Sequence, residues 1–158
     1  MDKRKYTLLG LLPLVAMTLA FILSFEGCTP KPTEAPTTTV ITGTGQLSVA
    51  ETDKIDTYTF SKDGATYGNI KMVWYASDWI SFEGYGIMEG SGATAPDSGY
   101  GPSAQVGSVG TSYFIKTDDK VHYARILIAT KSENTTTGFT AISFQWVLQT
   151  EANNRNLY

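Results

Sequence analysis

The residues best suited to chemistry in this chain are four carboxylates in its central part, Asp78, Glu83, Glu89 and Asp97. Glycoside hydrolysis uses two carboxylates placed on opposite sides of the bond that breaks. A chain with fifteen Asp and Glu residues contains such groups by chance, so their presence alone does not indicate an active site. A carbohydrate-processing function stays an alternative, and we expect no catalysis.

Nucleophilic catalysis and zinc binding would both depend on single residues. The chain has one histidine, His122, and one cysteine, Cys28, and no motif surrounds either of them. A Ser-His-Asp triad, a Cys-His pair or a zinc site would each need at least one of the two. His122 falls in a predicted strand, where packing or surface exposure is the more common role. We therefore predict no catalytic residue and no cofactor.

Two short acidic clusters could contribute oxygen ligands to a metal ion. Glu51, Asp53 and Asp56 form one cluster, and Asp118 and Asp119 form the other. Calcium is bound by about six to eight oxygen ligands, and neither cluster has the regular acidic spacing of a self-contained calcium loop. These acids are predicted to be solvated turn residues, with no metal site.

Three aromatic residues, Trp79, Tyr85 and Tyr100, form the candidate ligand platform of the sequence. Sugar rings present apolar C–H faces that can lie on an exposed aromatic ring, while polar side chains bind the hydroxyl groups. Tyr and Trp are also common in strands and in buried cores. Packing therefore competes with carbohydrate binding as the role of these rings.

The first 28 residues differ in composition from the rest of the chain. Three basic residues at positions 3–5 precede a mainly apolar, uncharged run at 6–25, which as a helix would be about 30 Å long. A basic start is retained in the cytoplasm, so the later residues are expected outside it. The segment 1–28 is interpreted as a lipoprotein signal with Cys28 as the lipid attachment site, as an uncleaved hydrophobic helix, or as a cleaved secretion signal. The first two interpretations keep the domain on the cell membrane.

A tether and a modification site fit this location outside the cytoplasm. Residues 29–39 are rich in Pro and Thr and have no apolar periodicity, which predicts an extended tether. Asn134 begins an Asn-Thr-Thr triplet that matches the acceptor pattern for N-glycosylation, in a polar loop. This site matters only in a host that glycosylates exported proteins.

Residues 40–150 show a period of two, which predicts strands. The clearest alternations are at 70–76 and 142–148, and shorter candidates are at 46–49, 56–61, 79–88, 112–117 and 121–130. Turn-rich breaks at 61–64 and 117–120 separate them. We predict an all-β, antiparallel β-sandwich of jelly-roll type with seven or eight strands, and a small barrel is the alternative. Residues 151–158 are expected to form a C-terminal tail.

A long glycine-rich segment at 89–110 interrupts this pattern. Loops of this length are uncommon in compact domains and are often functional. The alternative is a flexible insertion, with one short strand at 104–106.

Two parts of the sequence resemble the pre-peptidase C-terminal family of β-sandwich domains found in secreted proteins. The segment 45–53 followed by Asp56-Thr57-Tyr58-Thr59-Phe60 resembles the opening of these domains, and 113–116, 121–126 and 138–142 resemble their closing strands. The acidic strand of the family is replaced by Trp79-Ile80-Ser81-Phe82-Glu83-Gly84, which argues against a family metal site. The resemblance implies an accessory domain without catalysis.

Charge and composition narrow the range of partners. The net charge is −3 and no basic patch follows the N-terminus, so nucleic acid is not expected as a partner. We predict a non-catalytic, membrane-tethered binding or surface-assembly module outside the cytoplasm. Its expected partners are the membrane, through the N-terminal segment, and a surface protein or a glycan. A subunit of a surface filament is a further alternative.

Overall fold

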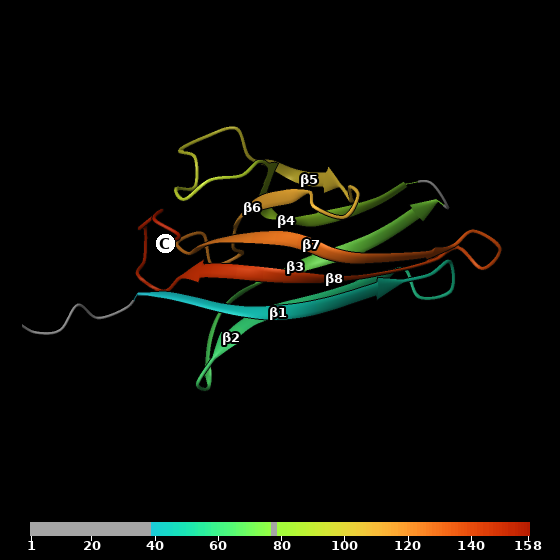
Figure 1. The fold of residues 1–158 in the computed structure, drawn as a ribbon, viewed down its shortest axis with the longest axis horizontal. Coiled ribbons are helices and arrows are strands. Elements are labelled where there is room, and N and C mark those ends of the chain that lie inside the picture. Colours follow the sequence, from blue (N-terminus) through green and yellow to red (C-terminus); the bar gives the residue numbers. More distant parts are fainter. Residues whose placement is uncertain (1–38, 77–78) are drawn as a thin grey trace, which may run out of the picture. The chain divides into compact units, whose positions relative to one another are not determined.

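The computed structural model describes residues 39–76 and 79–158, and its regular structure is entirely β (Figure 1). The predicted anchor at 1–28, its lipid attachment site Cys28, nearly all of the predicted tether and Asp78 lie outside the described residues. The eight strands are β1 (Val40–Val49), β2 (Ile55–Lys62), β3 (Ala65–Ala76), β4 (Trp79–Glu89), β5 (Gly101–Gln105), β6 (Ser112–Lys116), β7 (Tyr123–Asn134) and β8 (Phe139–Gln149).

All eight strands belong to one antiparallel sheet with the order β1-β8-β7-β6-β4-β3-β2, and β5 pairs with β4 outside this path. β4 connects the two halves because it pairs with β3 over its first residues and with β6 from Gly86 to Glu89. The predicted all-β, antiparallel fold of seven or eight strands is confirmed. The arrangement differs from the expected two-sheet sandwich, since hydrogen bonding through β4 makes one nearly closed sheet.

Side chains hold the two ends of the sheet, β1 and β2, close together. The Ser48 backbone N–H donates a hydrogen bond to the Asp56 carboxylate (2.8 Å), and the Tyr58 hydroxyl donates one to the Thr44 carbonyl (3.0 Å). Gly45 permits this approach, because a Cβ atom there would lie 2.4 Å from the Phe144 ring and 2.7 Å from the Tyr58 ring. Polar side chains of β2 thus replace a regular ladder between these strands.

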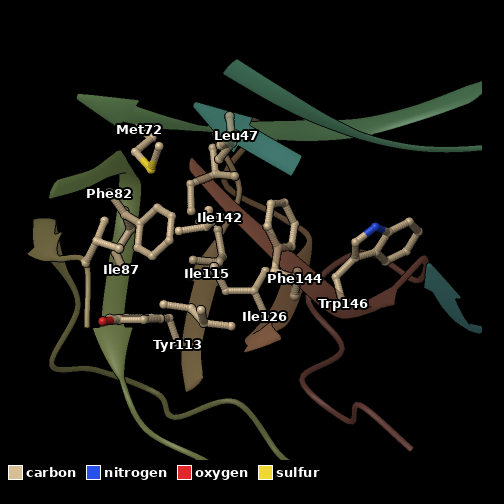
Figure 2. Packing of buried hydrophobic residues seen from close by; sticks show 14 of the residues in the cluster. Leu47, Met72, Phe82, Ile87, Tyr113, Ile115, Ile126, Ile142, Phe144 and Trp146 are labelled. Carbon is tan, nitrogen blue, oxygen red and sulfur yellow. The ribbon is translucent and has the colours of Figure 1, made fainter. Parts of the chain in front are cut away.

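The main core lies inside the nearly closed sheet and receives side chains from β1 to β4 and β6 to β8 (Figure 2). Alternation along each strand places Ile70, Met72 and Trp74 of β3 inside, together with Ile80 and Phe82 of β4. The rings of Phe82 and Tyr113 pack edge to face, with centroids 5.1 Å apart. The period of two therefore marks the inner face on β3 and on the first half of β4, whereas a register shift between Glu83 and Ile87 brings Ile87 into the core with the opposite parity.

Several strands extend beyond the ranges that the sequence predicts. β1 begins at Val40 and β3 at Ala65, five or more residues before the apolar alternation starts. β7 and β8 form a long hairpin in which Asn134 pairs with Phe139. These extensions carry several exposed Thr and Ser residues and no apolar alternation, so backbone pairing with a neighbouring strand defines them and hydrophobic periodicity does not.

A second, smaller apolar cluster lies on the outer side of the sheet. Phe114 points outward because its neighbours Tyr113 and Ile115 point into the main core. Ala95 of the glycine-rich segment and Leu157 near the C-terminus pack against it, together with Tyr123. We call this region the covered face.

Backbone hydrogen bonds hold the two covering segments together. The Ala95 N–H donates to the Arg155 carbonyl (2.9 Å), and the Leu157 N–H donates to the Ala93 carbonyl (2.7 Å). Leu157 is buried, so the predicted C-terminal tail is a packed part of the domain. This part of the glycine-rich segment therefore has a structural role in covering apolar side chains.

Candidate functional site

The outer side of β3, β4 and β5 carries aromatic and polar side chains. Among the described residues, no other segment packs an apolar cluster over them. The side chains that alternate with the core residues of β3 and β4 point to this side. We call it the aromatic face, and its members are Asn69, Lys71, Tyr75, Trp79, Ser81, Glu83, Tyr85 and Ser103.

A shallow groove at one end of the aromatic face is bordered by two exposed rings. Tyr75 and Trp79 are each 56% exposed and line the groove together with Ala76, Ser81 and Ser103. The β3–β4 pairing shifts register between Trp74 and Ala76, so Tyr75 lies at a β-bulge. Bulges change the direction of a side chain and are frequent beside functional sites.

A second shallow groove continues along the same face. It is lined by Lys71, Glu83, Tyr85 and Ser103, with Asn69, Gly84, Pro102 and Asp118 completing its border. Ser103 lines both grooves, so they form one continuous surface across β3, β4 and β5. Glu83 lies between the two ends and is directly opposite Lys71 of β3 and Ser103 of β5.

The carboxylate of Glu83 accepts a hydrogen bond from the Tyr75 hydroxyl. This bond, more than burial or charge repulsion, raises the pKa of Tyr75 above its usual value of 10.0. The contact orients an exposed ring with a neighbouring carboxylate, and no other described residue forms a hydrogen bond with the second oxygen of Glu83, which can accept one from a ligand.

Positive charge gathers at the Tyr85 end of the face. The ammonium groups of Lys116 and Lys120 lie 5.5 and 5.2 Å from the centroid of the Tyr85 ring, within the range of cation–π attraction. Tyr85 is 49% exposed. Asp118 is engaged nearby, because its carboxylate accepts hydrogen bonds from the backbone N–H (2.9 Å) and the side-chain amide (2.8 Å) of Asn69.

Tyr100, the third residue of the predicted platform, has different neighbours from Trp79 and Tyr85. It packs on the cluster of the covered face, with its ring 6.4 Å from that of Tyr123. Its hydroxyl is buried without a hydrogen-bond partner among the described residues. Burial raises the pKa of Tyr100 to about 12. The structure therefore places Trp79 and Tyr85 on one face and gives Tyr100 a packing environment.

The candidate metal ligands do not gather. The described residues contain no group of three or more His, Cys, Asp or Glu side chains that could hold a metal ion. Asp56 closes the sheet by accepting from Ser48, and Asp118 is bound to Asn69. These acids act as hydrogen-bond acceptors for the backbone.

His122 takes part in a network at the turn between β6 and β7. Its Nδ1 lies 2.5 Å from the Asp119 carboxylate and its Nε2 lies 3.2 Å from the Thr150 carbonyl. Burial alone would raise the pKa of Asp119, but hydrogen bonds from His122, from the Val121 backbone and from the Thr117 hydroxyl outweigh it and lower this pKa to about 2. The network ties the turn to the end of β8.

The candidate hydrolytic carboxylates within the described residues lie in different places. Glu83 lines the groove of the aromatic face, Glu89 lines a separate depression beside Gly110, and Asp97 forms an ion pair with Arg155. Asn134 is exposed at the end of β7, where its side-chain oxygen accepts hydrogen bonds from the Thr136 (3.0 Å) and Thr137 (3.3 Å) backbones.

The sequence did not assign five members of the aromatic face to a site, namely Asn69, Lys71, Tyr75, Ser81 and Ser103. Lys71 and Tyr75 fall on the lighter face of the predicted strand 70–76, and this alternation is the signal that could have found them. Ser81 and Ser103 join the face only through the pairing of β4 with β5. No local pattern contains that information.

Comparison of the chain with known protein families, with curated proteins and with solved structures finds no match. Within the described part of the chain, no helix is long and apolar enough to span a membrane.

Proposed function

We propose that this protein is a non-catalytic binding module, tethered to a membrane outside the cytoplasm, that recognises its partner through the aromatic face. The observation that carries the proposal is the exposure of Tyr75, Trp79 and Tyr85 along grooves that share Ser103. Contiguous exposed apolar groups on a soluble domain commonly mark an interaction site. The location rests on the composition of residues 1–39.

The positions of the candidate carboxylates that the structure describes fit binding without catalysis. Hydrolysis of a glycosidic bond needs two carboxyl groups that face one substrate. Glu83 lies beside Tyr75, whereas Glu89 lines another depression and Asp97 pairs with Arg155. Asp118 lines the groove with Glu83, but two hydrogen bonds from Asn69 occupy its carboxylate.

Assembly of several copies through their sheet edges has less support than binding through the aromatic face. β5 lies at the side of β4 opposite β3, since Ser81 pairs with both Val73 and Gln105. β5 has only five residues and contains Pro102, which has no backbone N–H to donate. A short edge strand with a proline resists pairing with a second chain. Recognition by side chains of the aromatic face therefore fits the fold better than filament growth.

Site-specific photo-crosslinking in the host tests the proposed function. A photoreactive amino acid replaces Trp79 in the full chain, and the matched control places it at Phe139, which is 38% exposed on β8. We expect an adduct enriched at position 79 over position 139. Equal labelling at both positions, or none, contradicts the proposed binding face.

A further inference from the structure

The aromatic face has the chemistry of a saccharide site at its Trp79 end. Tyr75 and Trp79 present exposed rings on which the C–H face of a sugar can stack. Ser103 lines the same groove and supplies an exposed hydroxyl group, which can both donate and accept hydrogen bonds, whereas Ser81 is buried.

The middle of the face adds a charged donor and a charged acceptor. Lys71 and Glu83 lie opposite each other on β3 and β4, and both line the second groove. Glu83 is already oriented by the Tyr75 hydroxyl. Sugar hydroxyls accept from an ammonium group and donate to a carboxylate, so one ring can bind both side chains.

The length of the face favours a chain of sugars over a single sugar. Trp79 and Tyr85 are six residues apart on β4, which corresponds to about 20 Å along the strand. This span is several times the length of one sugar ring. The two grooves are continuous through Ser103, so one extended ligand can contact both ends.

The Tyr85 end of the face carries charged groups of both signs. Lys116 and Lys120 lie near the Tyr85 ring, and Lys71 borders the same groove. Glu83 and Asp118 line this groove as well, so three cations lie near two carboxylates and the groove can accept a neutral or an acidic saccharide. The described residues that line the Trp79 groove are uncharged.

We infer that the aromatic face binds an extended polysaccharide, whose rings stack on Tyr75 and Trp79 and whose hydroxyl groups bind Ser103, Glu83 and Lys71. This inference rests on the proposed function, because it specifies the ligand of the same face. It involves no covalent step.

Calorimetric titration of the full chain, held in a detergent without a sugar headgroup, tests the inference. The probes are cellohexaose, N-acetylchitohexaose and hexagalacturonic acid, each compared with its disaccharide. At least one hexasaccharide is expected to bind more tightly than its disaccharide. Trp79→Ala should weaken that binding about tenfold, the value of one lost stacking contact. The matched variant Phe139→Ala should bind like the unchanged chain.

The outcomes separate this inference from the proposed function. Absence of binding to all three hexasaccharides, or equal binding by the Trp79→Ala and unchanged chains, overturns the polysaccharide inference. If crosslinking at position 79 then still yields a specific protein adduct, the binding function stands and the ligand is a protein. If both experiments are negative, the inference and the proposed function both fail.

Discussion

The outer side of the sheet has two regions that both contain aromatic residues but differ in their exposure to solvent. On the covered face, Phe114 and Tyr123 are buried beneath the glycine-rich segment and the C-terminal residues. On the aromatic face, Tyr75, Trp79 and Tyr85 are exposed beside polar side chains. The difference indicates that aromatic content alone does not mark a binding surface. What marks it is the absence of a covering segment together with polar groups between the rings.

The largest expected effect is on the covered face. Phe114→Ala removes a ring that is 2% exposed and leaves a cavity beneath Ala95 and Leu157. We expect the free energy of unfolding to fall by about 3–5 kcal/mol, measured by urea unfolding. Trp79→Ala on the aromatic face should change it by less than about 0.5 kcal/mol. Equal losses in the two variants would remove the distinction between the faces.

Removal of the buried Leu157 side chain tests whether the C-terminal residues are a packed part of the fold. Leu157→Ala leaves the backbone bond to Ala93 in place and deletes a buried side chain. The expected loss is about 2–5 kcal/mol, toward the lower end because the site is near the chain terminus. Hydrogen exchange of the Ala95 N–H should accelerate in parallel. An unchanged unfolding midpoint with unchanged exchange would show that the segment is only a loose tail.

The turn between β6 and β7 borders the aromatic face, since the Lys120 ammonium group lies 5.2 Å from the Tyr85 ring centroid, and the same turn holds Asp119. Asp119→Asn should lower the free energy of unfolding by about 1–3 kcal/mol, because hydrogen bonds to a charged group are lost.

The same variant should also alter the pH dependence of stability. The pKa of Asp119 is lowered in the folded chain from 3.8 to about 2. Its contribution to the free energy of unfolding is therefore complete above pH 3.8 and is lost as the pH falls toward 2. Unfolding midpoints of the Asp119→Asn chain and of the unchanged chain should converge over this pH range. Parallel curves would contradict the assigned network.

The smallest expected effect concerns Tyr100, whose hydroxyl has no hydrogen-bond partner in the described structure. Tyr100→Phe deletes this buried polar atom and keeps the ring. We expect the free energy of unfolding to stay equal or to rise by up to about 1 kcal/mol. In absorbance titration, the variant should lack a phenol that ionises at about pH 12. A clear loss of stability would indicate a polar partner for the hydroxyl.

The sequence predicted the strands wherever apolar alternation was strong, as in Ile70, Met72 and Trp74. It did not predict the packing of Leu157, since a single leucine in a polar tail carries no periodicity and is buried only by contacts with residues far away in the chain. Trp79 and Tyr100 looked equivalent as candidate platform residues. Their different environments arise from strand pairing and from the covering segment, which are non-local features.

The candidate site was predicted in part. Trp79 and Tyr85 both fall on the predicted strand 79–88, but the period of two does not by itself place them on one face, because the alternation of β4 changes parity between Glu83 and Ile87. The contributions of Ser103 and Lys71 depend on the neighbours of β4, because Glu83 meets both across the sheet. Order of strands in a sheet is not readable from local alternation.

Acrylamide quenching of tryptophan fluorescence in the full chain tests the contrast between exposed and buried rings most directly. The chain has three tryptophans, of which Trp79 is 56% exposed while Trp74 and Trp146 are 9% and 4% exposed. We predict one strongly quenched component, absent in Trp79→Phe and protected by a hexasaccharide that binds. Strong quenching that persists in Trp79→Phe, or that a bound hexasaccharide leaves unchanged, would contradict the assignment of the aromatic face as the open, ligand-binding surface.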